Sequence, residues 1–144
     1  MIRPYEPDDL AQVIEVWSQS ASIAHAFLPA SYFTAERAAI ASTWMPMAET
    51  TVFEREGRVD GFCSLIGDEL GGLFVRPDAQ RAGIGGALVD DARARRARLE
   101  LTVFEANTIG RRFYIDYGFE EVGREIDEAT GEPGLRLRID GLGR

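Results

Sequence analysis

The chain has 144 residues, of which 45% are hydrophobic and 28% are charged, a balance typical of globular proteins. At this length we expect a single domain over residues 1–144 that buries roughly two-thirds of its unfolded surface. The net charge of −8 is opposite in sign to that of most nucleic-acid-binding domains, so no nucleic-acid partner is expected. An acidic surface would attract cationic amines, although solubility is the stronger explanation for it.

Cysteine content and the absence of targeting motifs point to one compartment. The single cysteine, Cys63, lies among apolar residues and is expected to be a buried core residue rather than a nucleophile. One cysteine cannot form a disulfide within the chain, which favours a reducing environment. We find no signal peptide, transmembrane run or lipidation motif, so we expect a cytoplasmic protein without a membrane partner. No metal-ligand spacing occurs, and no metal is expected.

The first fifty residues predict one strand and two helices. Residues 2–5 are predicted to form a short strand, and apolar side chains recur at helical spacing from Leu10 to Trp17. A second helix is expected over residues 34–47, with Thr34 as its N-cap.

The segment between these helices, residues 20–33, is irregular and contains the only histidine. His25 and Phe27 lie there in an aromatic-rich stretch, and loops often carry binding residues. Two interpretations stay open: these side chains line a substrate pocket, or His25 is buried in a loop that its aromatic neighbours pack down.

Three strands are expected next. Residues 50–55 and 59–66 have the alternating or continuous apolar pattern of β-strands. A glycine-containing turn separates them, which predicts a hairpin. A third strand follows over residues 69–75. The pair Gly71-Gly72 inside it weakens a strand and is typical of a bulge or of a close backbone approach.

The stretch after this third strand is the most informative part of the chain. Pro77 ends the strand, because it fixes φ and has no N–H to donate. Gly83, Gly85 and Gly86 follow, and then a helix-forming composition continues to about residue 98. The N–H groups of a first helical turn have no partner, and glycines let an anion approach them. The ligand expected at this position is a phosphate or diphosphate.

The remainder of the chain predicts strand, helix and two strands. Residues 99–104 return as a strand parallel to 69–75, because a helix connects the two. Asn107 suits the N-cap of a helix that ends at Gly118, and a strand begins at Phe119. Residues 135–139 alternate cleanly, as in a half-buried strand near a sheet edge, and such an edge would pair across a homodimer.

Three kinds of phosphate loop must be distinguished for residues 80–86. A P-loop ends in Gly-Lys-Ser/Thr, and this chain contains no lysine. A Rossmann loop places its first glycine directly after the strand, whereas residues 76–82 intervene here. The third type is Gln-x-x-Gly-x-Gly, present from Gln80 to Gly85, which resembles the acetyl-CoA pyrophosphate loop of the GNAT superfamily of N-acetyltransferases.

A second motif extends this resemblance to nearly the whole chain. Asn107, Phe113-Tyr114 and Gly118-Phe119 are similar to the GNAT pattern Asn-x-x-Ala-x-x-Phe-Tyr followed by Gly-Phe. Gly110 stands where the family usually has alanine, which costs roughly 1 kcal/mol of helix propensity and is expected to alter no functional group.

The stretch Ala24-His25-x-Phe27-Leu28, together with Trp17-x-x-Ser20, further resembles the small bacterial YjaB-type branch of the superfamily.

The resemblance implies a fold and an activity. The fold is α/β: a single-domain GNAT fold whose mixed, mostly antiparallel twisted sheet has one splayed parallel strand pair and about four flanking helices. The activity is acetyl transfer from acetyl-CoA to a primary amine, by direct attack on the thioester. The cofactor-binding positions that it implies are Phe74, Val75, Gln80, Arg81, Ala82, Gly83, Ile84, Gly85, Gly86, Asn107 and Tyr114.

Roles in catalysis follow from the thioester chemistry and the resemblance. The backbone N–H of Val75 is the candidate for stabilising the developing oxyanion. Tyr114 is placed near the sulfur and is expected to protonate the leaving thiolate. For the general base, Glu69 is the first candidate, Glu105 the second and His25 the third, and each is also explained as an ordinary polar residue.

Two questions stay open at this point. The acceptor is either a small-molecule amine or a protein amine. A non-catalytic acetyl-CoA-binding sensor or partner-docking module would keep the glycine loop as well, although it would not need Tyr114.

Overall fold

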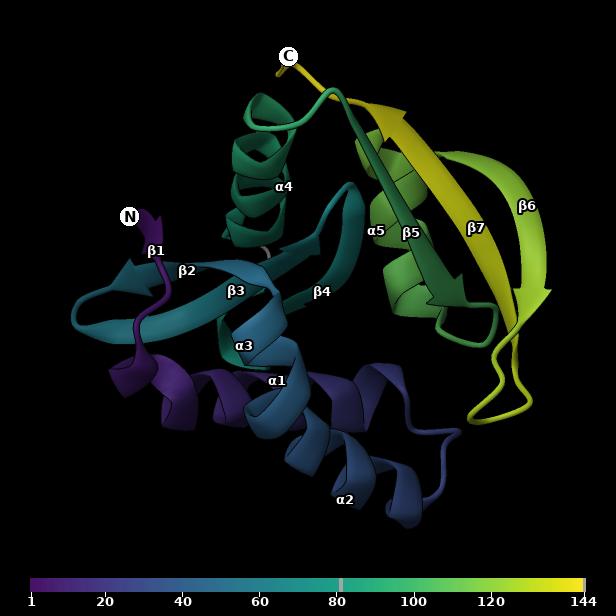
Figure 1. Ribbon diagram of the computed structural model, residues 1–144, viewed down its shortest axis with the longest axis horizontal. Helices are drawn as coiled ribbons and strands as arrows, with labels where there is room; N and C mark the ends of the chain where they lie inside the picture. The colour runs from purple at the N-terminus through teal and green to yellow at the C-terminus, as the bar shows by residue number, and fades with distance from the viewer. Residues whose placement is uncertain (81, 144) are drawn as a thin grey trace.

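The computed structural model describes residues 1–80 and 82–143. Seven strands form one sheet in the order β1-β2-β3-β4-β5-β7-β6 (Figure 1). Every neighbouring pair is antiparallel except β4 and β5, which run parallel. The expected mixed sheet with one parallel pair is confirmed. The strands are β1 (Ile2–Pro4), β2 (Glu49–Arg55), β3 (Arg58–Ile66), β4 (Glu69–Val75), β5 (Arg98–Phe104), β6 (Glu120–Ile126) and β7 (Pro133–Asp140).

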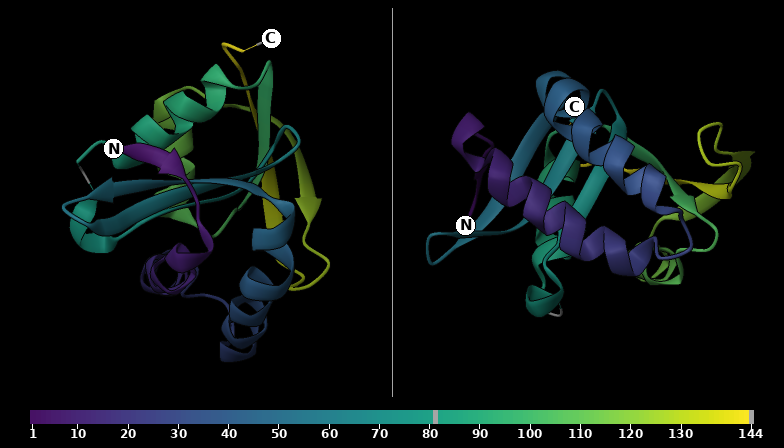
Figure 2. Two further views of the ribbon diagram at one scale, coloured as in Figure 1. Left: turned by 60° about the vertical axis from the view of Figure 1, so that its left-hand side comes forward. Right: turned by 90° about the horizontal axis from the view of Figure 1, so that it is seen from below.

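Helices cover both faces of this sheet, and Figure 2 shows α1 and α4 on opposite sides of it. The helices are α1 (Leu10–Ala24), α2 (Ala30–Ala39), α3 (Met45–Met47), α4 (Ile84–Ala94) and α5 (Thr108–Tyr117). A π-helical turn, η2 (Ile40–Trp44), joins α2 to α3, and two 3₁₀ turns lie at Pro7–Asp9 and Pro77–Ala79. No helix in the described ranges has the length and apolar composition needed to cross a membrane.

The second helix begins earlier than the sequence predicts. α2 starts at Ala30 because Pro29 takes the N-cap position, and its carbonyl accepts the N–H of Tyr32 at 3.0 Å. Thr34 lies inside the helix and donates its hydroxyl to the carbonyl of Ala30 at 3.3 Å, so its assignment as N-cap is wrong.

Helix α4 ends at Ala94, about four residues before the predicted end. The last residues of the chain lie against this end, and their backbone N–H groups donate to carbonyls at and just beyond the helix terminus. Gly143 donates to Arg93 and Arg96 at 3.0 and 2.8 Å, and Leu142 donates to Arg93 at 2.6 Å. These bonds satisfy acceptors that a helix end otherwise leaves to water.

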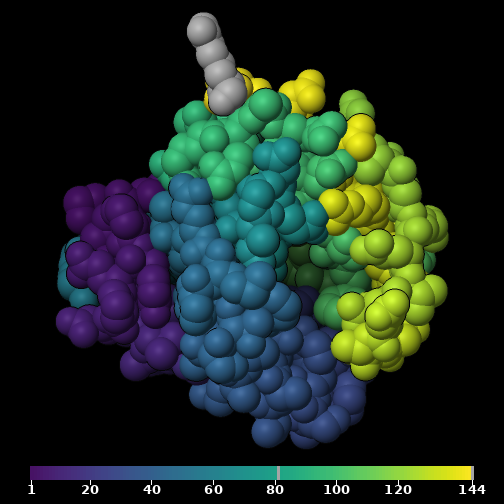
Figure 3. Space-filling view, viewed as in Figure 1, coloured from purple at the N-terminus to yellow at the C-terminus, as the bar shows by residue number. Residues whose placement is uncertain are grey.

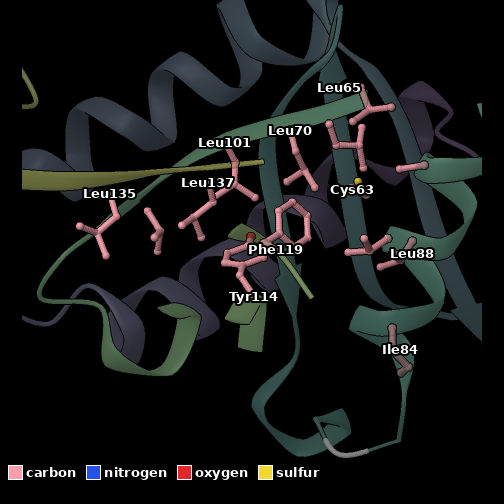
Figure 4. Close-up of a cluster of buried hydrophobic side chains, with 14 of the residues drawn as sticks. Cys63, Leu65, Leu70, Ile84, Leu88, Leu101, Tyr114, Phe119, Leu135 and Leu137 are labelled. Atoms are coloured by element: carbon pink, nitrogen blue, oxygen red, sulfur yellow. The ribbon is translucent and has the colours of Figure 1, made fainter. Parts of the chain in front are cut away.

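Two apolar cores hold the helices to the sheet. The larger core, between the sheet and helices α4 and α5, contains Leu88, Leu101 and Leu137 together with Tyr114 and Phe119 (Figure 4). The smaller core lies on the other face, where Val13, Val16 and Trp17 of α1 pack against Val52 and Phe62. Burying such side chains contributes about 1.5–3 kcal/mol each to folding.

Strand β7 lies next to the edge of the sheet but is paired on both sides, with β5 and with β6. The prediction that residues 135–139 offer a free edge for a homodimer is therefore wrong. Strand β6 occupies that edge instead.

Candidate active site

The parallel strands β4 and β5 meet at one end only. Their single bridge pairs Glu69 with Glu100, near the start of both strands. Beyond that point the strands have no further pairing and reach their ends at Val75 and Phe104 without a partner in each other (Figure 1). The result is a wedge that opens toward the C-terminal ends of the pair.

A β-bulge on β4 explains why the strands separate. Ser64 of β3 pairs with Gly72, and Leu65 pairs with Leu70, which leaves Gly71 as an extra residue. A bulge bends its strand and increases the local twist, so β4 turns away from β5. The bulge that Gly71-Gly72 predicts is confirmed, and it shapes the wedge.

Backbone polar groups of β4 face this wedge. The N–H of Arg76 donates to the carbonyl of Asp60 on β3 at 2.8 Å. Because the groups of an antiparallel strand alternate in direction, the N–H and carbonyl of Val75 point away from β3 and into the wedge. The Val75 carbonyl accepts the side-chain amide of Gln80 at 3.2 Å. Phe74, unlike Val75, contributes its side chain to the wall of the wedge.

The N-terminus of α4 lies at the open end of the wedge. Gly83 is the N-cap and has φ +78°, a left-handed conformation that favours glycine. Its carbonyl accepts the N–H of Ala87 at 3.0 Å, the first hydrogen bond of the helix. The N–H groups of residues 84–86 therefore have no partner inside the helix, and with the helix dipole they suit an anion.

The glycines of this loop serve different purposes. Among the described residues, a Cβ on Gly83 or Gly86 would meet no atom within 4 Å, so both leave open space beside the N–H groups of the first helical turn. A Cβ on Gly85 would lie 3.2 Å from the ring of Phe113, so this glycine permits the packing of α4 against α5. Ala82 is exposed. Arg81, expected to add a positive charge here, lies outside the described residues.

A cavity of about 500 Å³ occupies the wedge and continues toward α2 and α3. Figure 3 shows its mouth as a hollow between the blue segment of α2 and α3 and the yellow-green segment of β6 and β7. Aromatic rings form much of its wall, and carboxylates stand among them. The wall includes Tyr32, Trp44, Phe104, Glu36, Glu69 and Asp127.

Tyr114 of α5 forms part of the cavity wall from the side of the larger core. Its side chain is only 8% exposed, and its ring packs edge-on against Phe113 and Phe119 at centroid distances of 5.2 and 5.3 Å. Burial raises the pKa of Tyr114 above its ordinary value, so the phenol is protonated at neutral pH. It can donate a hydrogen bond into the cavity.

Asn107 and His25 lie side by side on the cavity wall. Asn107 caps α5, because its side-chain carbonyl accepts the N–H of Gly110 at 2.9 Å. Its amide nitrogen lies 3.4 Å from Nε2 of His25. Burial lowers the pKa of His25 to about 4, so the imidazole is neutral at pH 7. Within the described residues, its Nδ1 is buried without a hydrogen-bond partner.

Phe27, predicted beside His25 as a substrate-binding residue, stands behind the cavity. Its ring packs edge-on against His25 and Phe104, at centroid distances of 6.1 and 5.6 Å. The cavity wall includes His25 and Phe104 but not Phe27. His25 is thus packed among aromatic rings and also lies on the cavity wall, so the two interpretations of this segment do not exclude each other.

Glu69, the first candidate for a general base, is held by an ion pair. Nη2 and Nη1 of Arg136 approach its two carboxylate oxygens at 2.5 and 2.6 Å. Glu105, the second candidate, faces Arg124 at 3.6 Å and takes no part in the cavity wall. Cys63 is fully buried, and burial raises the pKa of its thiol to about 12, which fits the core role expected for it.

Comparison with known proteins agrees with this geometry. Residues 46–121 match the family model described as the acetyltransferase (GNAT) domain, which is more than half of the chain. The chain belongs to the GNAT acetyltransferases. Its fold contains the splayed strand pair that the resemblance implied, and α4 begins directly after the glycine-rich loop.

Among curated relatives of this acetyltransferase, two Escherichia coli proteins align over most of their length. The peptidyl-lysine N-acetyltransferase YiaC is 32% identical over 134 residues, which cover 92% of each chain. The peptidyl-lysine N-acetyltransferase YjaB is 31% identical over 144 residues, or 99% of this chain and 97% of YjaB.

Solved structures give the same picture. The solution structure of apo YjaB has a TM-score of 0.86 at 28% identity and covers 100% of this chain and 98% of that one. The similarity to the YjaB-type branch is therefore supported by sequence and by structure. PaiA N-acetyltransferase from Thermoplasma acidophilum, solved in complex with coenzyme A, shares the fold at a TM-score of 0.75 and 19% identity.

The sequence alone did not single out most of the far wall of the cavity of this acetyltransferase. Tyr32 belongs to the irregular, aromatic-rich stretch 20–33, but Glu36 and Trp44 come from residues 34–47, predicted to be a plain helix, and Asp127 comes from the connection between β6 and β7. The aromatic and acidic content of residues 32–44 was the one signal available. Their meeting with Asp127 depends on strand order, which no local pattern encodes.

Proposed function

We propose that the chain transfers the acetyl group of acetyl-CoA to the ε-amine of lysine in proteins, and that residues 1–144 act as one acetyltransferase domain. The observation that carries this proposal is the wedge between β4 and β5, with a helix N-terminus suited to an anion at its open end and a cavity of about 500 Å³ that continues toward α2 and α3. The choice of lysine is supported by the names of YiaC and YjaB, which describe those proteins as peptidyl-lysine N-acetyltransferases.

The residues present fit acetyl-CoA. Free N–H groups at residues 84–86 and the open space beside Gly83 and Gly86 suit the pyrophosphate. The main-chain groups of Val75 are directed into the wedge, where the pantetheine amides need partners, and Asn107 stands at its wall. When bound, acetyl-CoA supplies an acetyl group activated as a thioester.

In this proposal two donors serve the chemical step. The N–H of Val75 stabilises negative charge on the carbonyl oxygen, because a fixed donor in a cavity needs no reorganisation as charge develops. The hydroxyl of Tyr114 donates to the departing sulfur, and its protonated state at neutral pH supports that role. The amine nitrogen bonds to the acetyl carbon as the carbon–sulfur bond breaks.

Glu69 is the first candidate from the sequence for the base that removes the proton from the acceptor amine, but we propose a different route for this proton. Both oxygens of Glu69 are engaged by Arg136, and burial lowers the pKa of His25 to about 4, which makes its imidazole a weak base. We therefore propose that the proton leaves through water in the cavity. The Glu69–Arg136 pair then fixes the narrow end of the wedge, where β4 meets β5.

The proposal is tested by incubating the purified protein with acetyl-CoA and a lysine-containing peptide, and by following coenzyme A release and peptide mass. We expect acceptor-dependent release and a peptide heavier by one acetyl group. Thermal stabilisation by acetyl-CoA without transfer to any peptide or small amine would contradict an enzyme and favour a sensor. The absence of both effects would contradict the cofactor assignment.

A further inference from the structure

One carboxylate in the cavity differs from the others in its surroundings. Glu36 lies on the cavity wall and accepts a hydrogen bond from Nε1 of Trp44 at 2.8 Å. Glu69 has Arg136 as a counter-ion, whereas within the described residues Glu36 forms no ion pair. Burial, together with the negative charge of Asp127, raises the pKa of Glu36 above its ordinary value. A carboxylate in this position is incompletely compensated.

The local backbone brings Trp44 to Glu36. The turn η2 is π-helical over Ile40–Trp44, and such a turn adds a residue to the helix and rotates everything after it. The buried Ile40 anchors the start of the turn in the smaller core. The two partners are eight residues apart, and their bond holds the carboxylate in one orientation.

The rest of the wall suits a cation on an apolar stem. Tyr32 lies one helical turn before Glu36, and its ring packs edge-on near Phe104, at a centroid distance of 6.5 Å. Asp127 faces the same cavity, and in the part of the chain that the structure describes its carboxylate accepts only the N–H and hydroxyl of Thr130, at 3.0 and 2.8 Å. Aromatic walls can pack against methylene groups, and ring faces attract ammonium groups.

We propose that Glu36 is the residue that recognises the positive charge of the acceptor, with the indole of Trp44 holding its carboxylate toward the cavity. This inference rests on the proposed acetyl transfer to lysine, and it deepens that function by naming a residue that determines specificity. The ammonium supplies the counter-charge that Glu36 lacks. Glu36 therefore acts on binding of the acceptor, before the amine loses its proton and attacks.

The experiment measures kcat and KM for a peptide with a single lysine, using wild type, Glu36→Gln and Trp44→Phe. Glutamine keeps an oxygen that accepts the indole N–H and removes only the charge. We expect Glu36→Gln to raise KM for the peptide about tenfold, as for a lost hydrogen bond to a charged group, with kcat within twofold and unchanged affinity for coenzyme A. Trp44→Phe should raise KM by a smaller factor, because the carboxylate remains but is no longer oriented.

Two controls separate recognition from structure. Glu120→Gln removes an exposed carboxylate of β6 that takes no part in the cavity wall, and it should leave KM unchanged. Salt gives a second readout: KM of wild type should rise with ionic strength, and this dependence should weaken in Glu36→Gln, because charge attraction is screened.

The outcomes distinguish this inference from the function on which it rests. A wild type that transfers acetyl groups, with Glu36→Gln showing the KM and salt dependence of wild type, would overturn the role of Glu36 and leave the proposed function standing. Equal increases of KM in Glu36→Gln and Glu120→Gln would also overturn it, because general surface charge would then explain the effect. A wild type that binds coenzyme A but acetylates no amine would overturn both.

Discussion

The side chain of Asn107 lies directly against the backbone of Gly110. Its carbonyl oxygen accepts the N–H of Gly110 at 2.9 Å, and a Cβ on residue 110 would stand only 2.5 Å from its amide nitrogen. The glycine at this position therefore contacts a predicted site residue, which a comparison of helix propensities alone does not reveal. Glycine makes room for the side chain that caps α5 and faces the cavity.

Replacing Gly110 by alanine should give no gain in stability. Alanine improves helix propensity by about 1 kcal/mol, but the Cβ displaces Asn107, and losing an N-cap costs about 1 kcal/mol. We expect unfolding free energies within about 0.5 kcal/mol of wild type in a denaturant titration, together with weaker binding of coenzyme A. A variant stabilised by the full propensity gain, with unchanged binding, would show that Asn107 adapts freely.

Gly86→Ala provides a contrast, because a Cβ at this position meets open space. We expect the free energy of unfolding to increase by up to about 1 kcal/mol. Affinity for coenzyme A in calorimetry should fall several-fold, because the methyl group stands beside the N–H groups proposed to hold the pyrophosphate. Unchanged affinity in a folded Gly86→Ala protein would remove Gly86 from the cofactor site.

Tyr114→Phe tests the proposed donor to the departing sulfur. Both rings fill the same space between Phe113 and Phe119, so stability and coenzyme A affinity should change little. General acid catalysis typically contributes about 10²–10⁴-fold, and we expect kcat to fall by about 10²-fold. A phenylalanine variant with the kcat of wild type would remove Tyr114 from the mechanism.

We expect the titration of His25 to account for part of the pH dependence of the free energy of unfolding. Burial lowers its pKa to about 4 in the folded protein, whereas in the unfolded chain it titrates near about 6.5. The unfolded chain therefore binds the additional proton between these values, and the free energy of unfolding rises with pH across that window. The contribution of His25 is present above about pH 6.5 and is lost as the pH falls toward about 4.

His25→Gln isolates this contribution from that of the carboxylates. Denaturant titrations between pH 4 and 7 should give a shallower rise of unfolding free energy with pH in the variant. The difference between the two proteins should amount to at most about 3 kcal/mol over the window. Parallel curves for the two proteins would show that His25 remains solvated and titrates normally.

Local patterns predicted much of the fold and part of the site. The bulge at Gly71-Gly72, the glycine-rich loop that opens α4 and the cap at Asn107 depend on conformations set within a few residues. Each follows from a residue type whose backbone or side chain favours that geometry. The misplaced start of α2 has the same local origin, since Pro29 takes the cap position that was assigned to Thr34.

The sequence by itself determined the glycine-rich loop that opens α4, the parallel crossover from β4 to β5 and hence the cofactor side of this acetyltransferase. Only the tertiary structure decided the acceptor side. Glu69 and Arg136 are 67 residues apart, and Glu36 faces Asp127 across the cavity because β7 lies between β5 and β6. Contacts of this kind depend on how separate elements pack, and packing is governed by the burial of whole faces rather than by the order of neighbouring residues.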